Sequence, residues 1–263
     1  VGGDAIEITV LLKAGADPHT YTATPQDMVA LHDADAIFAN GLNLEESLLP
    51  TLGAVQGPPI VSVNEGVTLI EAGGHAEEAG AAESHAHGRY DPHTWQSVAS
   101  VAQWATNVAT ALSALDPARA GEYSADAATY RAELSQLDAE VRAILAPVPA
   151  GRRKLVTDHD TFAYFARDYD FTVVGSVIPS FSSLASISAQ DLAALQEQIG
   201  KDGAHVVFMR STVNPRLAEQ IAADMQLPVV PLYSDALGAE GTSGASYVGM
   251  MRTNAQAIAA ALQ

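Results

Sequence analysis

The chain has 263 residues and carries 13 Lys and Arg against 31 Asp and Glu, a formal net charge of −18 with histidine neutral. Such an acidic protein would repel nucleic-acid phosphates, so we expect no nucleic-acid partner. Cysteine is absent, which excludes disulfides, thiolate metal sites and cysteine nucleophiles. The length fits one large or two medium folded domains. A hydrophobic share of 48% excludes a disordered chain. No apolar run is long enough to span a membrane.

The first part of the chain alternates between short apolar runs and an amphipathic segment. The apolar runs predict three strands, at residues 6–11, 36–39 and 60–63. Residues 25–34 predict a helix, because Thr24 can cap it and Pro25 suits its first turn. Strands that alternate with helices indicate an α/β fold with mostly parallel sheets.

Residues 71–90 interrupt this pattern and predict a long loop, because they are rich in Gly, Ala, Glu and His and show no apolar period. Three histidines of this loop, His75, His85 and His87, could assist weak capture of a metal ion. Regular structure is expected to resume at residues 91–95 and to run into a helix that continues through Ala111.

The longest predicted helix starts at Asp116-Pro117 and ends before Pro147. Its apolar residues recur at steps of three and four from Tyr123 to Ile144, which is the pattern of one buried stripe. At 1.5 Å per residue this helix would reach roughly 45 Å, more than one small sheet needs. The helix therefore predicts a division into an N-terminal α/β lobe, a rigid linking helix and a C-terminal α/β lobe, at residues 1–115, 116–147 and 148–263.

The last part of the chain repeats the alternation of strands and helices. Strands are expected at residues 154–157, 171–174, 205–209 and 228–232. Helices are expected at residues 161–169, 188–199, 214–225 and 246–262. This series predicts a second α/β unit of similar size.

Three histidines and one aspartate could carry the chemistry. His19 and His93 each follow an Asp-Pro pair, His159 lies in an Asp-His-Asp triplet, and Asp235 follows the last predicted strand. All four lie next to strand or helix ends, where α/β folds gather their binding loops. Neutral imidazole and carboxylate are good ligands for a divalent transition metal, and four of them can close a tetrahedral shell. The aspartates that neighbour the histidines could orient the imidazole rings.

Enzymatic alternatives find less support in the sequence. There is no glycine-rich nucleotide motif, no His-Glu-x-x-His and no Gly-x-Ser-x-Gly. A zinc hydrolase would use the three histidines as ligands and Asp235 or Asp160 as its base. Four protein ligands, however, leave little room for a catalytic water.

Several segments resemble, in order along the chain, the motifs of the zinc/manganese-specific solute-binding proteins of ABC transporters (cluster A-I, or cluster 9). These segments are residues 12–27, 34–45, 90–95, 157–165, 231–238 and 247–254. The resemblance covers nearly the whole chain. It departs from the family at Arg210, where an acidic residue is common, and before Val1, where the family usually has a strand and a helix, so we expect the sequence to begin after them.

The resemblance implies two α/β lobes joined by a rigid backbone helix, with a metal held between them by His19, His93, His159 and Asp235. It also implies capture outside the cytoplasmic membrane, by a periplasmic or lipid-anchored monomer. The partner would be a membrane permease, and a metallochaperone is a further candidate. Most manganese members are similar but carry Glu where His159 stands, so zinc is the expected ion. A manganese or iron binder of the same fold and a metal-stabilised adhesin remain the alternatives.

Overall fold

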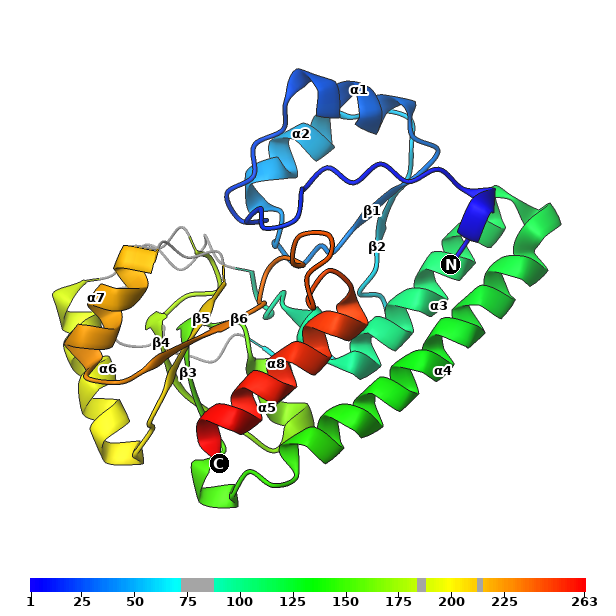
Figure 1. Ribbon diagram of the computed structural model, residues 1–263. Coiled ribbons are helices and arrows are strands. Elements are labelled where there is room, and N and C mark those ends of the chain that lie inside the picture. Colours follow the sequence, from blue (N-terminus) through cyan, green and yellow to red (C-terminus); the bar gives the residue numbers. More distant parts are fainter. Residues whose placement is uncertain (72–87, 184–187, 212–214) are drawn as a thin grey trace. The chain divides into compact units, whose positions relative to one another are not determined.

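The computed structural model describes residues 1–71, 88–183, 188–211 and 215–263. It consists of two compact units, Val1–Gln136 and Leu137–Gln263, which we describe in turn (Figure 1). The expected domain boundaries at residues 115 and 147 stay a prediction. In the part of the chain that the structure describes, no helix combines the length and the apolar character that crossing a membrane requires.

The first unit contains a small parallel sheet and short helices. Strand β1 (Ile37–Ala39) pairs with β2 (Ile60–Ser62), with Ile37 opposite Ile60. Helix α1 (Pro25–Asp33) precedes β1, and α2 (Leu49–Ala54) lies between the two strands in the chain. Helix α1 begins as predicted, because the Thr24 hydroxyl accepts the backbone N–H of Asp27 while the Asp27 carboxylate accepts that of Thr24.

The strand predicted at residues 6–11 is not formed, so this expectation was wrong. The segment is irregular, and among the described residues β1 pairs with β2 alone. Ile8 and Val10 are 70% and 72% exposed. An alternating pattern is therefore not sufficient here, because an extended segment becomes a strand when a neighbouring strand accepts its backbone hydrogen bonds.

Two long helices complete the first unit. Helix α3 (Val98–Leu115) begins at Ser97, whose hydroxyl accepts the N–H of Ser100. Helix α4 (Ala120–Leu145) follows after a 3₁₀ turn and continues into the second unit. The two helices share one buried apolar cluster, which contains Ala105, Ala109 and Leu112 of α3 and Tyr123 and Ala127 of α4. The long helix is thus confirmed, although its predicted first turn is 3₁₀.

The second unit is built on a four-stranded parallel sheet. Its strands are β3 (Lys154–His159), β4 (Thr172–Ile178), β5 (Val207–Arg210) and β6 (Val229–Leu232). Their order across the sheet is β4-β3-β5-β6. The chain moves outward from β3 to β4 and then returns to place β5 on the other side of β3. Such a switch point opens a crevice at the carboxyl ends of the two central strands.

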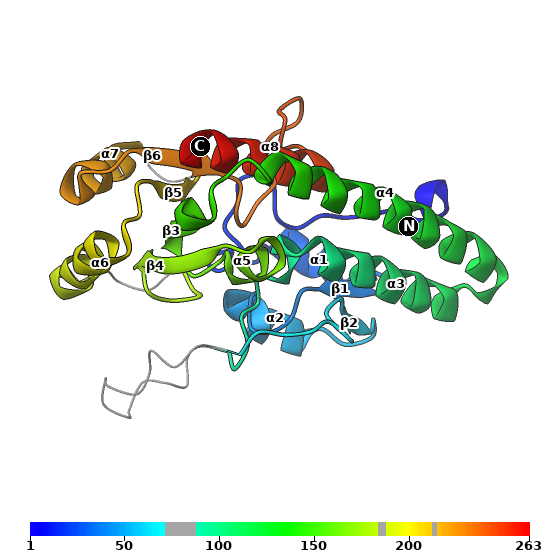
Figure 2. The ribbon, with the colours of Figure 1, turned by 90° about the horizontal axis from the view of Figure 1, so that it is seen from below.

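Helices cover both faces of this sheet. Helices α6 (Ala189–Asp202) and α7 (Pro215–Met225) lie on one face, and α5 (Ala163–Tyr169) and α8 (Tyr247–Leu262) lie on the other (Figures 1 and 2). The core under α6 and α7 contains Val156, Val177, Leu195, Ile199, Val207, Met209, Ile221 and Met225. The predicted α/β fold class with parallel sheets and a long helix is confirmed.

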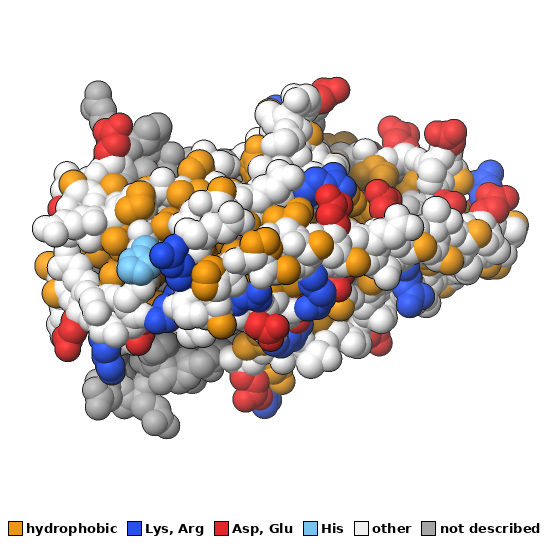
Figure 3. Space-filling view, turned by 60° about the horizontal axis from the view of Figure 1, so that its bottom comes forward, with side chains coloured by type: hydrophobic (Ala, Val, Ile, Leu, Met, Phe, Trp, Pro, Cys, Tyr) orange, Lys and Arg blue, Asp and Glu red, His pale blue; other side chains and the backbone are white. Residues whose placement is uncertain are grey.

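The acidic excess does not form one continuous patch on the face that Figure 3 shows. Acidic and basic side chains are interspersed there with apolar ones. The acidic side chains on this face are therefore dispersed and do not form an anionic surface.

Candidate metal centre

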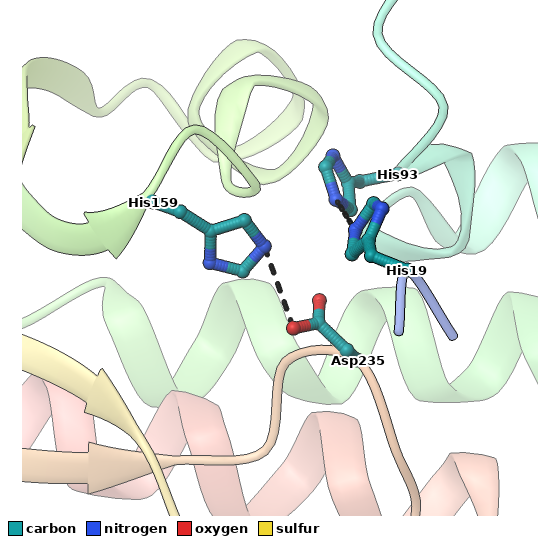
Figure 4. Close-up of side chains that lie close together, drawn as sticks. All are labelled: His19, His93, His159 and Asp235. Atoms are coloured by element: carbon teal, nitrogen blue, oxygen red, sulfur yellow. Dashed lines mark hydrogen bonds and ion pairs between the residues drawn. The ribbon is translucent and has the colours of Figure 1, made fainter. Parts of the chain in front are cut away.

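The two Asp-Pro-His turns of the first unit fold in the same way. In each turn the aspartate carboxylate accepts the backbone N–H of the histidine two residues later, at 2.9 Å for Asp17 and His19 and at 2.9 Å for Asp91 and His93. The two imidazoles approach each other, and their Nε2 atoms lie 3.3 Å apart (Figure 4). Both histidines are buried.

His93 is also held through its second ring nitrogen. Its Nδ1 atom lies 2.8 Å from Oδ1 of Asp91, and neither side chain is exposed to solvent. Because a carboxylate is an acceptor, the imidazole N–H is on Nδ1 and donates to Asp91. The lone pair on Nε2 is therefore directed towards His19. A histidine prepared in this way is suited to bind a metal through Nε2.

A network of amides and hydroxyls holds the turn that carries His93. The Asn40 side chain donates to the carbonyl of Pro92 at 3.0 Å. The Asn64 side-chain oxygen accepts both the Thr94 hydroxyl at 2.6 Å and the Trp104 indole N–H at 2.8 Å. The amide of Asn64 donates in turn to the carbonyl of Asn40. The sequence analysis did not identify these positioning residues.

Glu45 stabilises the Asn40-Gly41 turn. Its carboxylate accepts the backbone N–H groups of Asn40 at 2.6 Å and Gly41 at 3.0 Å. Burial raises the pKa of Glu45, and the backbone donors act in the opposite direction. The carboxylate thus orders the chain immediately after β1, where Asn40 contacts the histidine turn.

The second unit places a histidine and an aspartate together at the carboxyl edge of its sheet. His159 is the last residue of β3, and Asp235 follows the end of β6. The Nε2 atom of His159 lies 3.4 Å from Oδ2 of Asp235 (Figure 4). The Nδ1 atom lies 3.3 Å from Oδ2 of Asp158, and all three side chains are nearly inaccessible to solvent.

The protonation of His159 is set by these two carboxylates. Burial lowers the pKa of the imidazole, but the negative charges of Asp235 and Asp158 outweigh that effect and hold the pKa well above its ordinary value. The three groups therefore favour a cation between the carboxylates, either a proton on His159 or a metal ion in its place.

Arg210 contacts the same carboxylates. Its Nε atom lies 3.0 Å from Oδ2 of Asp158, and its Nη1 atom lies 3.6 Å from Oδ2 of Asp235. Arg210 ends β5, the strand next to β3, so the switch point of the sheet brings it beside His159. The sequence analysis noted Arg210 only as a departure from the family pattern.

The remaining predicted residues have different outcomes. His75, His85 and His87 lie outside the described residues, while the base of their loop is joined by a bridge between Glu71 and Tyr90. Asp160, the other candidate base of the hydrolase alternative, accepts a hydrogen bond from the Ser176 hydroxyl of β4 at 2.6 Å.

The spacing within each pair suits metal ligation. Two ligands at a Zn–N distance of about 2.0–2.1 Å and a tetrahedral angle are separated by roughly 3.3–3.4 Å. The pair in the first unit measures 3.3 Å and the pair in the second 3.4 Å. Each unit by itself therefore presents two donor atoms at the separation of one edge of a tetrahedral site.

Comparison with known proteins agrees with this chemistry. Residues 1–261 match the family model described as zinc-uptake complex component A, periplasmic. The zinc-binding protein TroA of Treponema pallidum is 34% identical over 98% of this chain and 82% of its own length. The metal ABC transporter substrate-binding lipoprotein FimA of Streptococcus parasanguinis is 28% identical over 100% of this chain and 84% of its own length.

Solved structures of periplasmic metal-binding proteins are also similar to this chain. Periplasmic TroA from Treponema pallidum superposes with a TM-score of 0.86 at 31% identity, covering 99% of this chain and 92% of that one. A manganese-bound mutant of a periplasmic metal-binding protein from Candidatus Liberibacter asiaticus gives a TM-score of 0.85 at 25% identity, with 100% and 93% covered. The similarity thus extends over both units.

Proposed function

Because the chain belongs to the family of periplasmic zinc-uptake components, we propose that it is the solute-binding subunit of an ABC importer and that its cargo is zinc. Relatives of this chain are described as metal ABC transporter substrate-binding lipoproteins and as a zinc-binding protein. The chain accordingly acts outside the cytoplasmic membrane. The observation that carries the proposal is the tetrahedral-edge spacing of donor atoms in each of the two units.

The ligands of the zinc ion are His19, His93, His159 and Asp235. His19 and His93 supply one buried edge of the shell, and His159 with Asp235 supplies the other. Four such donors complete a closed tetrahedral shell, which is typical of a site that holds zinc rather than one that activates water. This donor set supports capture and release of the ion, and it gives no support to hydrolysis.

Three imidazoles and a single carboxylate favour zinc over manganese. Nitrogen donors suit zinc, whereas manganese prefers oxygen donors. A relative in Streptococcus pneumoniae is nevertheless described as a manganese ABC transporter substrate-binding lipoprotein, so manganese is the competing cargo that the test must include.

The partner that receives the ion is a membrane permease. We expect the binding protein to act as a monomer and a metallochaperone to be a further source of its zinc. The loop histidines His75, His85 and His87 would assist capture, so deletion of residues 74–88 should slow zinc loading more than it weakens equilibrium binding.

The proposal is tested by elemental analysis of the purified protein, followed by titration of the demetallated protein with zinc and with manganese. We expect one zinc per chain and a tighter Kd for zinc than for manganese. A tighter Kd for manganese would assign that ion as the cargo, and binding of neither ion would refute the function. His32→Ala serves as the control variant, because His32 is exposed and lies outside the four ligands.

A further inference from the structure

Arg210 is a positive charge placed beside the proposed metal ligands of the second unit. Its side chain is only 16% exposed, and it bridges two buried carboxylates, with Nε 3.0 Å from Asp158 and Nη1 3.6 Å from Asp235. Its position at the end of β5 next to the end of β3 is fixed by the sheet order. Unlike His159, a guanidinium stays charged under all ordinary conditions.

Arg210 approaches the carboxylate oxygen of Asp235 that also faces His159 and would bind the metal. Oδ2 of Asp235 lies 3.6 Å from Arg210 Nη1 and 3.4 Å from His159 Nε2. An ion bound by His159 and Asp235 would therefore share this oxygen with the guanidinium. Since Asp158 and Asp235 contribute two negative charges, the positive charge of Arg210 offsets one of them before the ion arrives.

We propose that Arg210 sets the metal specificity of the site, because it weakens the binding of hard divalent cations such as manganese relative to zinc. This inference rests on the proposed function. The guanidinium competes for the negative charge of the carboxylate oxygen of Asp235. A hard cation depends strongly on that oxygen, whereas zinc gains more of its binding energy from the nitrogen donors. Arg210 therefore penalises manganese more than zinc.

A purely structural role for Arg210 predicts a different result. If the ion pair with Asp158 served only to hold the ends of β3 and β5 together, removing it would lower the thermal stability and would change the affinities for both ions in parallel. The ratio of the two dissociation constants separates these two roles, because a general loss of folding does not change it selectively.

The test uses the full chain with Arg210→Met, which keeps much of the side-chain length and removes the charge. Arg210→Gln is the second variant, because it retains a hydrogen-bond donor towards Asp158. Kd values for zinc and for manganese are measured by competition at constant pH and ionic strength. The control is Arg252→Met, which removes a guanidinium of the same unit that pairs with Glu140 at 2.6 and 2.8 Å.

We expect manganese to bind about tenfold more tightly in both Arg210 variants and zinc to change by less than about threefold, with no change in the control. An unchanged ratio of the two Kd values in a folded variant, or a parallel weakening of both ions, would overturn the assignment of Arg210 while leaving the zinc function intact. If the wild-type protein bound neither ion, the proposed function would fail and this inference with it.

Discussion

The Nδ1 atom of His93 lies 2.8 Å from Oδ1 of Asp91, and the same oxygen accepts the backbone N–H of His93 at 2.9 Å. One carboxylate thus holds both the main chain and the ring of the histidine. Neither side chain is exposed, so bulk water does not substitute for the carboxylate. Asp91 therefore determines which nitrogen of His93 is available to a metal.

Replacing Asp91 by Ala should weaken zinc binding by about 10–100-fold, because the ring of His93 loses its orientation and its fixed tautomer. Asp91→Asn should weaken it less, since the amide oxygen can still accept a hydrogen bond. Zinc affinity is measured by competition with a chromogenic chelator, and folding is checked by circular dichroism.

The matched control for Asp91 is Asp33→Ala. Asp33 also lies beside a histidine, with its Oδ1 atom 3.0 Å from Nδ1 of His32, but both of these side chains are largely exposed. We expect no change in zinc affinity from this variant. Equal losses in the two variants would show that Asp91 acts through net charge and not through orientation.

Whether the two pairs of ligands bind one ion can be decided by stoichiometry. If they share a single zinc, then His19→Ala and His159→Ala should each weaken binding by more than about 100-fold, because every variant breaks the same shell. Isothermal titration then detects one site in the wild-type protein. Two independent sites, with one site surviving intact in each variant, would contradict the shared centre.

The sequence predicted most elements of the second unit because its strands are buried and its helices carry clear caps. Ser188, for example, forms the capping box of α6 with Asp191, and Gly203 ends the helix in a left-handed conformation. The candidate ligands came from two kinds of sequence signal. His159 and Asp235 follow predicted strands, where parallel sheets bind ligands, whereas His19 and His93 were chosen from their Asp-Pro-His turns and from the family resemblance.

Other features depend on which segments meet in space. The alternating residues 6–11 predicted a strand but have no partner strand among the described residues. Asn64 was missed for a similar reason, since its donors Thr94 and Trp104 lie 30 and 40 positions away. Arg210 became significant only once the sheet order placed β5 next to β3.

The buried amide of Asn64 should matter for stability. Asn64→Leu removes the acceptor of the buried Thr94 hydroxyl and of the half-buried Trp104 indole N–H, so both donors lose this hydrogen bond. The expected loss in the free energy of unfolding is about 1–3 kcal/mol, measured by urea denaturation of the metal-free protein. Thr129→Ala on the exposed surface of α4 is the control and should change it by less than about 0.5 kcal/mol. If Asn64→Leu left the free energy of unfolding unchanged, Asn64 would not be part of the structural framework.

The raised pKa of His159 predicts that zinc displaces a proton. Burial lowers that pKa, but Asp235 and Asp158 hold it well above its ordinary value, so the metal-free imidazole keeps its proton to a higher pH than an unperturbed histidine does. Zinc requires the neutral ring, and its affinity should therefore rise with pH until the raised pKa is passed. Calorimetric titrations in two buffers of different ionisation enthalpy should reveal a released proton in the wild-type protein and a smaller release in His159→Ala.

The stability of the metal-free protein should depend on pH in the opposite sense. A histidine whose pKa is raised by folding contributes stability that is fully present below the pKa of the unfolded chain and is lost as the pH rises through the folded value. Thermal unfolding with a chelator present should therefore show a Tm that falls from slightly acidic towards alkaline pH, whereas the increase in Tm on adding zinc should grow over the same range. If both quantities rose together with pH, the carboxylates would not be holding a proton on His159, and the electrostatic account of the second pair of ligands would be wrong.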